Sequence, residues 1–169
     1  MNTKKEVLST IFSRKSVRNF TDKKVSKEDL ELLLKAGMAA PSGKDRRPWD
    51  FFVISNKEIL DKMAEELPFA KMLKNVNHAI IVCGDSDKSD YWFLDCSAAT
   101  QNILLAAEAM GLGSTWTAAY PYRERIEVIK KNIEIQKNIT PLNIIPIGYP
   151  KGIEERKDKW DPSRVHWVE

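Results

Sequence analysis

The segment from Tyr91 to Met110 constrains the fold more than any other part of the sequence. It carries the longest helical signal in the chain and is rich in alanine and leucine. Its apolar residues lie on several sides of the helix, a distribution typical of a helix that packs against more than one neighbour. Gly111 and Gly113 follow it, and glycine commonly ends a helix. We therefore expect a central core helix. Its small side chains favour the close approach of another helix, and its several apolar sides favour an oligomer.

Four short runs of strand-forming residues are predicted to be strands: Phe51–Ile54, Ala79–Cys83, Ser114–Ala118 and Leu142–Ile147. The unbroken apolarity of Ala79–Cys83 predicts a strand buried on both faces. Pro146 has no N–H to donate, so the last run is predicted to be an edge strand or a strand end. Separated strands among helices predict an α+β or α/β layer protein, and the pattern leaves the strand directions open.

Four further segments carry helical signals. Apolar residues at helical spacing predict a helix over Lys4–Ser13. Ser26 is predicted to be the N-cap of a second helix, and Pro121 is placed in the first turn of a fourth. Ser55 and Asn56 are both candidates to cap the third. The predicted core face of the second helix consists of Leu30, Leu33, Leu34 and Met38.

Length and composition indicate one folded domain that spans residues 1–169. A chain that is 43% hydrophobic and 30% charged has enough apolar residues for a core, which argues against disorder. A net charge of +3 does not favour nucleic acid as a partner. No stretch reaches the roughly 18 apolar residues of a membrane span, so we expect no membrane contact and a cytoplasmic location. The tail over 149–169 contains Trp160 and Trp167 and is expected to dock, on another subunit.

The basic cluster Arg14-Lys15-Ser16-Val17-Arg18 is the first candidate for a binding site. Arginine presents a rigid fork of donors that suits phosphate, and Ser16 adds a neutral donor. The cluster is thus interpreted as a socket for a small anion. Taken alone, five residues fit a solvated basic patch better, so the choice depends on the rest of the chain.

Other familiar catalytic arrangements are not visible. His78 and His166 have no spaced acid or nucleophile, so a hydrolytic triad is not expected. Cys83 and Cys96 are thirteen positions apart in apolar surroundings, typical of inert core thiols, and we predict no metal site. The pair of glycines that follows the long helix lacks the third glycine of a dinucleotide loop and is interpreted as a helix end.

A set of motifs in a fixed order gives the chain its resemblance to a family. R-x-S-x-R at Arg14 is followed by A-P-S-G and Pro48-Trp49, then by D-x-x-A-A-x-Q-N-I-L-L-A-A from Asp95. G-L-G-S, I-G-Y-P and a terminal R-V-H-W come after these. Together they make the chain resemble the nitroreductase family of flavoproteins over nearly its whole length. Each motif alone is weak, whereas their joint order and spacing are specific.

The resemblance implies an α+β nitroreductase-like fold with a central mixed or antiparallel sheet flanked by helices. It also implies an intertwined homodimer with FMN at the subunit interface, with NADH or NADPH as the electron donor. The family's flavin contacts fall in this sequence on four groups of residues: Arg14, Lys15, Ser16 and Arg18; Pro41, Ser42, Gly43 and Asp45; Trp116, Thr117 and Ala118; and Lys157 and Lys159.

Roles follow from these positions. The resemblance assigns Arg14, Ser16, Lys157 and Lys159 to the FMN phosphate, and Arg18 to the pyrimidine edge as a tuning cation. Residues 41–43 match a loop that in relatives reaches the flavin from the partner subunit, and residues 116–118 match the segment beside flavin N5. No protein side chain is expected to be a catalytic nucleophile, because the flavin performs the hydride chemistry.

One departure and three functions remain open at this point. Asp45-Arg46-Arg47 stands where many relatives have asparagine and glutamine, and an ionised Asp45 accepts hydrogen bonds only. Arg47 is a candidate to compensate its charge. The favoured function is transfer of hydride from NAD(P)H to a small electrophilic acceptor, such as a nitroaromatic or a quinone, by ping-pong exchange. The alternatives are a flavin storage or sensing protein and a flavoenzyme that resembles a reductive dehalogenase.

Overall fold

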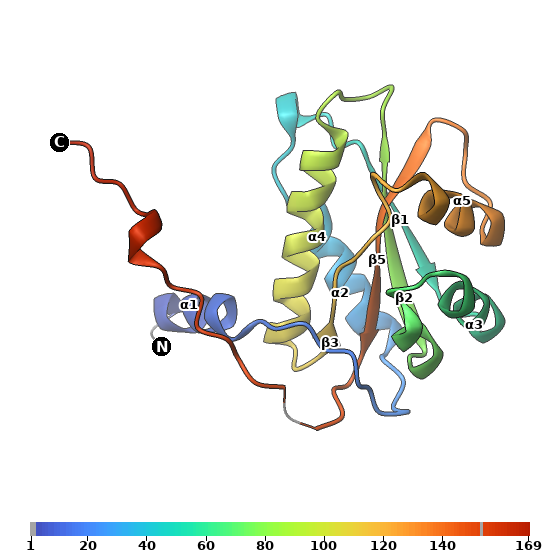
Figure 1. Cartoon of the computed structure of the whole chain (residues 1–169), viewed down its shortest axis with the longest axis horizontal. Helices are drawn as coiled ribbons and strands as arrows, with labels where there is room; N and C mark the ends of the chain where they lie inside the picture. The colour runs from blue at the N-terminus through green and yellow to red at the C-terminus, as the bar shows by residue number, and fades with distance from the viewer. Residues whose placement is uncertain (1–2, 153) are drawn as a thin grey trace.

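A computed structural model describes residues 3–152 and 154–169. One antiparallel sheet forms its centre, with the strand order β1-β2-β5-β3 and a fifth strand, β4, that also pairs with β5 (Figure 1). The strands are β1 (Trp49–Ile54), β2 (His78–Asp85), β3 (Gly113–Ser114), β4 (Thr117–Ala118) and β5 (Ile139–Gly148). The α+β class with an antiparallel sheet is therefore confirmed, and the strand directions that the sequence left open are defined.

Helices cover both faces of this sheet. They are α1 (Thr3–Ser13), α2 (Lys27–Met38), α3 (Lys57–Glu66), α4 (Trp92–Ala109) and α5 (Arg123–Asn132). In Figure 1, α2 and α4 lie on one side of the sheet, and α3 and α5 lie on the other. Short 3-10 turns, at Gly43–Asp45, Lys71–Asn75 and Pro162–Arg164, complete the helical elements of the described residues.

Strand β2 lies between two apolar cores. Ile80 and Val82 pack with α2 and α4, whereas Ile81 and Cys83 pack with α3 and the turn that follows it. Successive side chains of a strand point to opposite faces, so a strand that is covered on both faces needs apolar residues at every position. The prediction of a strand buried on both faces is confirmed, and all four side chains are fully buried.

The central helix α4 matches the expectation from the longest helical signal. Ala99, Ile103 and Ala107 are fully buried along it. Its neighbour α2 approaches closely at Gly37, where an added Cβ would lie 3.0 Å from two side-chain carbons of Ile103. The close approach of the two helices therefore depends on a glycine of α2 as well as on the small residues of α4.

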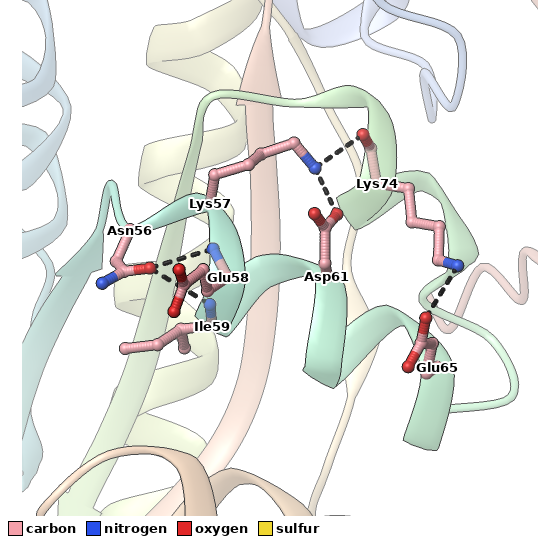
Figure 2. Close-up of polar contacts among 7 residues, drawn as sticks. All are labelled: Asn56, Lys57, Glu58, Ile59, Asp61, Glu65 and Lys74. Carbon is pink, nitrogen blue, oxygen red and sulfur yellow. Dashed lines mark hydrogen bonds and ion pairs between the residues drawn. The ribbon is translucent and has the colours of Figure 1, made fainter.

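Side-chain caps begin two of the helices where the sequence predicted them. The Ser26 hydroxyl accepts the Asp29 N–H at 3.0 Å, and the Asn56 side-chain oxygen accepts the N–H groups of Glu58 and Ile59. Figure 2 shows the Asn56 cap. Each cap satisfies N–H groups that a helix start leaves without partners.

The same close-up shows how α3 is tied to the turn after it. Lys57 forms an ion pair with Asp61 and donates to the carbonyl of Lys74 at 2.9 Å, and Lys74 pairs with Glu65 at 3.1 Å (Figure 2). These contacts are exposed, and they fasten the turn onto the helix before the chain enters β2.

Several sequence predictions about element positions are wrong. Pro121 precedes α5, which begins at Arg123, and Met38 is exposed at the end of α2. β5 is an inner strand, so Pro146 is on neither an edge nor a strand end. The single strand predicted over Ser114–Ala118 is two short strands.

The last two differences have one cause. β3 pairs with β5 through Gly148 and Ile147, and β4 pairs with it through Ile144 and Asn143. Pro146 therefore lies opposite the interruption between the two short strands. A residue without an N–H fits an inner strand where the neighbouring ladder is broken.

The first helix and the tail extend from the body of the chain (Figure 1). Phe20 bridges Pro150, and the Lys151 N–H donates to the Asn19 carbonyl, so the two extensions leave the sheet together. Trp160 and Trp167 are 73% and 86% exposed, so the tail does not bury its tryptophans on its own chain. None of the described helices is long and apolar enough to span a membrane.

Candidate functional site

The basic cluster Arg14–Arg18 is an extended segment that joins α1 to the sheet. Val17 is buried in the core, and its N–H donates to the Ser114 carbonyl at 3.0 Å. Alternate residues of an extended segment point to opposite sides, so a buried Val17 turns its neighbours Ser16 and Arg18 outward. The R-x-S-x-R spacing therefore suits a segment that inserts one residue in the core and presents the others.

A large pocket lies between this cluster and the tail. It has a volume of about 950 Å³ and includes Arg14, Lys15, Ser16 and Arg18 among its walls. Lys157 and Lys159 of the tail line it as well, with Gln101 of α4. Two groups of residues that are far apart in the sequence, and that the resemblance assigned to one phosphate, thus share one cavity.

The chemistry of this pocket suits an anion. Its walls combine guanidinium, ammonium and hydroxyl donors, which form charge-assisted hydrogen bonds with phosphate oxygens. Glu154, Glu155 and Asp158 line it too and add acceptors. The volume is at the upper end of the range for sites that bind small molecules and cofactors. The donor set and the size both fit FMN.

Lys15 differs from the other cations of the pocket. Its ammonium forms an ion pair with Glu108, with Nζ 3.2 Å from Oε1, and the two side chains are 29% and 15% exposed. Glu108 lies in the last turn of α4, so this ion pair fastens the basic cluster to the central helix. Lys15 therefore lines the pocket and also stabilises the attachment of the basic cluster to α4.

The loop with Pro41, Ser42, Gly43 and Asp45 lies at the other end of α4. The Gly43 N–H donates to Oδ1 of Asp95, a buried residue in the first turn of that helix, at 2.9 Å. The Ser42 hydroxyl accepts the Arg47 N–H at 3.0 Å. None of these loop residues lines the large pocket of the same chain.

Three residues of this loop other than glycine have positive φ. They are Lys44 at 54°, Asp45 at 55° and Arg47 at 46°. For residues with a Cβ this region costs about 1 to 2 kcal/mol each, so the contacts around the loop must offset the strain. The loop is thus a strained segment that several hydrogen bonds hold in place.

The Asp45 carboxylate is engaged within the loop. Both of its oxygens accept from the Arg47 guanidinium, at 2.7 Å and 2.6 Å. These two hydrogen bonds, which Arg47 donates, lower the pKa of Asp45 and raise the pKa of Arg47. Arg47 therefore neutralises the charge of Asp45 within the loop.

The segment Trp116–Ala118 consists of β4 and the residue that precedes it. Trp116 is 36% exposed and Thr117 is buried. The Ala118 carbonyl accepts from Nη1 of Arg125 at 3.2 Å. Arg125 also lies over the rings of Tyr122 and Phe69, so α5 holds this segment from outside the sheet. These residues do not line the large pocket.

The predicted site residues are thus brought together only in part. The pocket unites the basic cluster with the two tail lysines, whereas the loop over 41–45 lies at the opposite end of α4 (Figure 1). Asp95 and Glu108 mark those two ends, and thirteen residues of helix at 1.5 Å per residue separate their backbones by about 20 Å. One chain alone therefore does not place the loop over its own pocket.

Sequence reasoning did not single out three of the residues that build these regions. Gln101 and Asp95 stand in the motif quoted for the resemblance, and neither received a role. Glu108 is a carboxylate near the C-terminal end of the long helical segment. A negative charge near the C-terminus of a helix is unfavourable, and that anomaly was the signal available in the sequence.

Comparisons with known proteins show which family the sequence and the fold resemble. Residues 11–68 and 65–149 match the sequence model described as the nitroreductase family. A protein from Archaeoglobus fulgidus named "Putative NADH dehydrogenase/NAD(P)H nitroreductase" is 42% identical over 95% of this chain and 97% of its own. A crystal structure with the same name from Bacteroides thetaiotaomicron is 58% identical, covers 95% of this chain and 96% of its own, and has a TM-score of 0.94. An FMN-dependent nitroreductase from Clostridium difficile is 30% identical, with a TM-score of 0.90 and coverage of 96% and 99%.

Proposed function

Because this chain belongs to the nitroreductase family, we propose that it takes hydride from NADH or NADPH and passes it to a small electrophilic acceptor, such as a nitroaromatic or a quinone. It is an FMN-dependent NAD(P)H oxidoreductase, in agreement with the names of its relatives. The bound FMN supplies the hydride-transfer chemistry. The residues of the chain bind and orient this group and adjust its charge environment.

The observation that carries the proposal is the shared pocket of the basic cluster and the tail. We assign Arg14, Ser16, Lys157 and Lys159 to the phosphate, since their donors line one cavity. Arg18 lines the same cavity and is assigned to the ring end of the flavin, where a cation stabilises negative charge. Lys15 contributes its backbone and its charge, and its ammonium stays with Glu108.

A homodimer completes this site in the proposal. α1 exposes a group of large apolar side chains, and the tail exposes two tryptophans, surfaces that a second copy would cover. The loop with Pro41, Ser42, Gly43 and Asp45 would then cover the flavin of the other subunit. The segment Trp116–Ala118 is assigned to the edge of the flavin, and the buried Thr117 hydroxyl is a candidate proton donor.

Donor and acceptor would use one flavin face in turn. The sequence contains no glycine-rich fingerprint of a separate nicotinamide domain, and the chain forms one α+β unit around one sheet. Alternating occupancy predicts ping-pong kinetics, with parallel lines in double-reciprocal plots of rate against donor at several acceptor concentrations.

The visible spectrum of the purified protein tests the function. We expect flavin absorbance, bleaching on anaerobic addition of NADH or NADPH, and recovery when a nitroaromatic or a quinone is added. A flavin that neither nicotinamide bleaches would contradict the proposal and favour storage or sensing. Recovery only with halogenated aromatics, with release of halide, would favour the dehalogenase-like alternative.

Two substitutions test the phosphate assignment. Arg14→Ala and Lys159→Ala each remove a charge-assisted contact of about 1.5 to 3 kcal/mol, which corresponds to a rise in the dissociation constant for FMN of about tenfold to a hundredfold. Lys151→Ala removes a lysine of the tail that does not line the pocket and is the matched control. Native affinity in both pocket variants would refute the assignment.

A further inference from the structure

Helix α4 contacts both separated regions of the proposed site through carboxylates. Asp95, in its first turn, accepts the Gly43 N–H at 2.9 Å, and Glu108, in its last turn, pairs with Lys15 at 3.2 Å. The helix is buried against the sheet and α2, so its length fixes the separation of these two contacts. The loop and the basic cluster are therefore tied to one rigid element.

Glu108 is placed where it does not help its own helix. The C-terminal end of a helix carries partial negative charge, so a carboxylate in the last turn is unfavourable there. Its side chain is 15% exposed, and its partner comes from the segment that forms the pocket wall. The ion pair fixes the position of Lys15, and through the backbone it restrains the neighbouring residues Arg14 and Ser16.

Asp95 holds a segment that would otherwise relax. The loop after Gly43 contains three residues with positive φ, so without an anchor it would move toward less strained conformations. Asp95 is 7% exposed; Oδ1 accepts from Gly43, and Oδ2 accepts from the Ser89 hydroxyl at 3.3 Å. A buried carboxylate with fixed partners on both oxygens has one orientation, which suits an anchor.

We propose that Asp95 and Glu108 are positioning residues for different flavins. Glu108 orients the pocket of its own subunit through Lys15, and Asp95 orients the loop that covers the flavin of the other subunit. This inference rests on the proposed FMN function and homodimer. Neither carboxylate touches the flavin, and each acts through the residue it holds.

Single substitutions separate the two roles. Glu108→Ala is expected to raise the dissociation constant for FMN about fivefold, and Glu108→Gln, which keeps an acceptor for Lys15, to restore most of the affinity. Asp95→Ala is expected to change FMN affinity less and to lower kcat/KM for the acceptor about tenfold, with a shifted flavin absorption band. Asp95→Asn, which keeps an oxygen acceptor for Gly43, should recover most of that loss.

The ion pair of Lys131 with Glu66 provides a matched control. Nζ of Lys131 lies 3.0 Å from Oε2 of Glu66, and the pair joins α5 to α3. Neither residue lines the pocket. Glu66→Ala should leave both FMN affinity and kcat/KM unchanged. An equal loss of FMN affinity in Glu66→Ala and Glu108→Ala would show a general effect on folding and overturn the role of Glu108.

Mixed dimers decide which flavin each carboxylate serves. Chains with Arg14→Ala and chains with Asp95→Ala, carrying different tags, are co-expressed and the mixed dimers isolated. Each such dimer should contain one site with an intact pocket under an intact loop, so about half of its sites regain wild-type turnover. Mixed dimers of Arg14→Ala with Glu108→Ala, assayed at the same limiting FMN concentration, should show no more activity than the mean of the two parent dimers, since both substitutions damage the pocket of their own chain.

Equal behaviour of the two mixtures would overturn the assignment, whether both regain activity or neither does. Failure of the underlying function has a different signature. In that case the wild-type protein itself would show no flavin or no bleaching by a nicotinamide, before any variant is made.

Discussion

Gly113 sits at the contact between the sheet and the basic cluster. A Cβ added there would lie 2.7 Å from Cγ1 and 2.9 Å from Cβ of Val17. Gly113→Ala is therefore expected to displace Val17, to lower the unfolding free energy by about 1 to 3 kcal/mol and to weaken FMN binding. Chemical denaturation and titration with FMN measure the two effects.

Gly111 provides the control for that substitution. Its φ is 71°, and nothing lies within 4 Å of an added Cβ. Gly111→Ala should lower the unfolding free energy by about 1 kcal/mol through backbone strain and leave FMN affinity unchanged. If Gly113→Ala bound FMN as tightly as Gly111→Ala, the packing of Val17 would not determine the shape of the pocket.

His78 connects stability to pH. Burial, followed by the charge of Lys24, lowers its pKa below the ordinary value of 6.5. The unfolded chain then binds more protons than the folded chain below about pH 6.5, so the unfolding free energy should fall as the pH decreases through that region. His78→Gln, which cannot be protonated, should show a smaller decrease between pH 7 and pH 5 in urea denaturation. Identical pH profiles for both proteins would contradict this prediction.

At the scale of elements, Asn56 determines where α3 begins. Its side chain accepts two backbone N–H groups, at 2.9 Å and 3.2 Å. Asn56→Ala should lower the unfolding free energy by about 1 kcal/mol, and Asn56→Asp should keep it, because aspartate caps equally well and suits the positive end of the helix. Thermal melting of both variants measures this, and an equal loss in the two would exclude capping as the cause.

The elements that sequence reasoning predicted well are those with local causes. Local sequence determines the helix caps at Ser26 and Asn56 and the apolar run of β2, because each depends on residues within a few positions of one another. Pro146 was misplaced because its fit depends on β3 and β4, which pair with β5 from a distant part of the sequence. Met38 was predicted to be buried from its spacing alone, yet α2 ends there and leaves it exposed.

At the scale of the whole molecule, α1 exposes a group of large apolar side chains that a second subunit would bury. Its exposed apolar residues are Val7, Leu8, Ile11 and Phe12. We expect Phe12→Glu to shift the protein from dimer to monomer and to weaken FMN binding, since a glutamate at a buried interface is unpaired. Sedimentation velocity and FMN titration on the same samples measure both effects.

Glu6 gives a control on the same helix. Helical spacing places it on the side away from those apolar residues, and it is exposed. Glu6→Lys should leave the protein dimeric and its flavin bound. Dimers of normal stability in Phe12→Glu would show that α1 does not form the interface.

The proposed site could be predicted from the sequence only through its motifs. Arg14, Ser16, Lys157 and Lys159 were grouped by resemblance, and their common cavity is a tertiary feature that no local pattern describes. Likewise, the pairing of Lys15 with Glu108 and of Asp45 with Arg47 depends on geometry that the sequence does not display. The part assembled from two chains stays a prediction.

The pocket between the basic cluster and the tail is bounded by two stretches that are separated in the sequence by every strand of the sheet. Bringing them together closes a long loop, which is entropically costly until the sheet between them has folded. The phosphate site is therefore expected to form late in folding, and flavin to bind only after the sheet is complete.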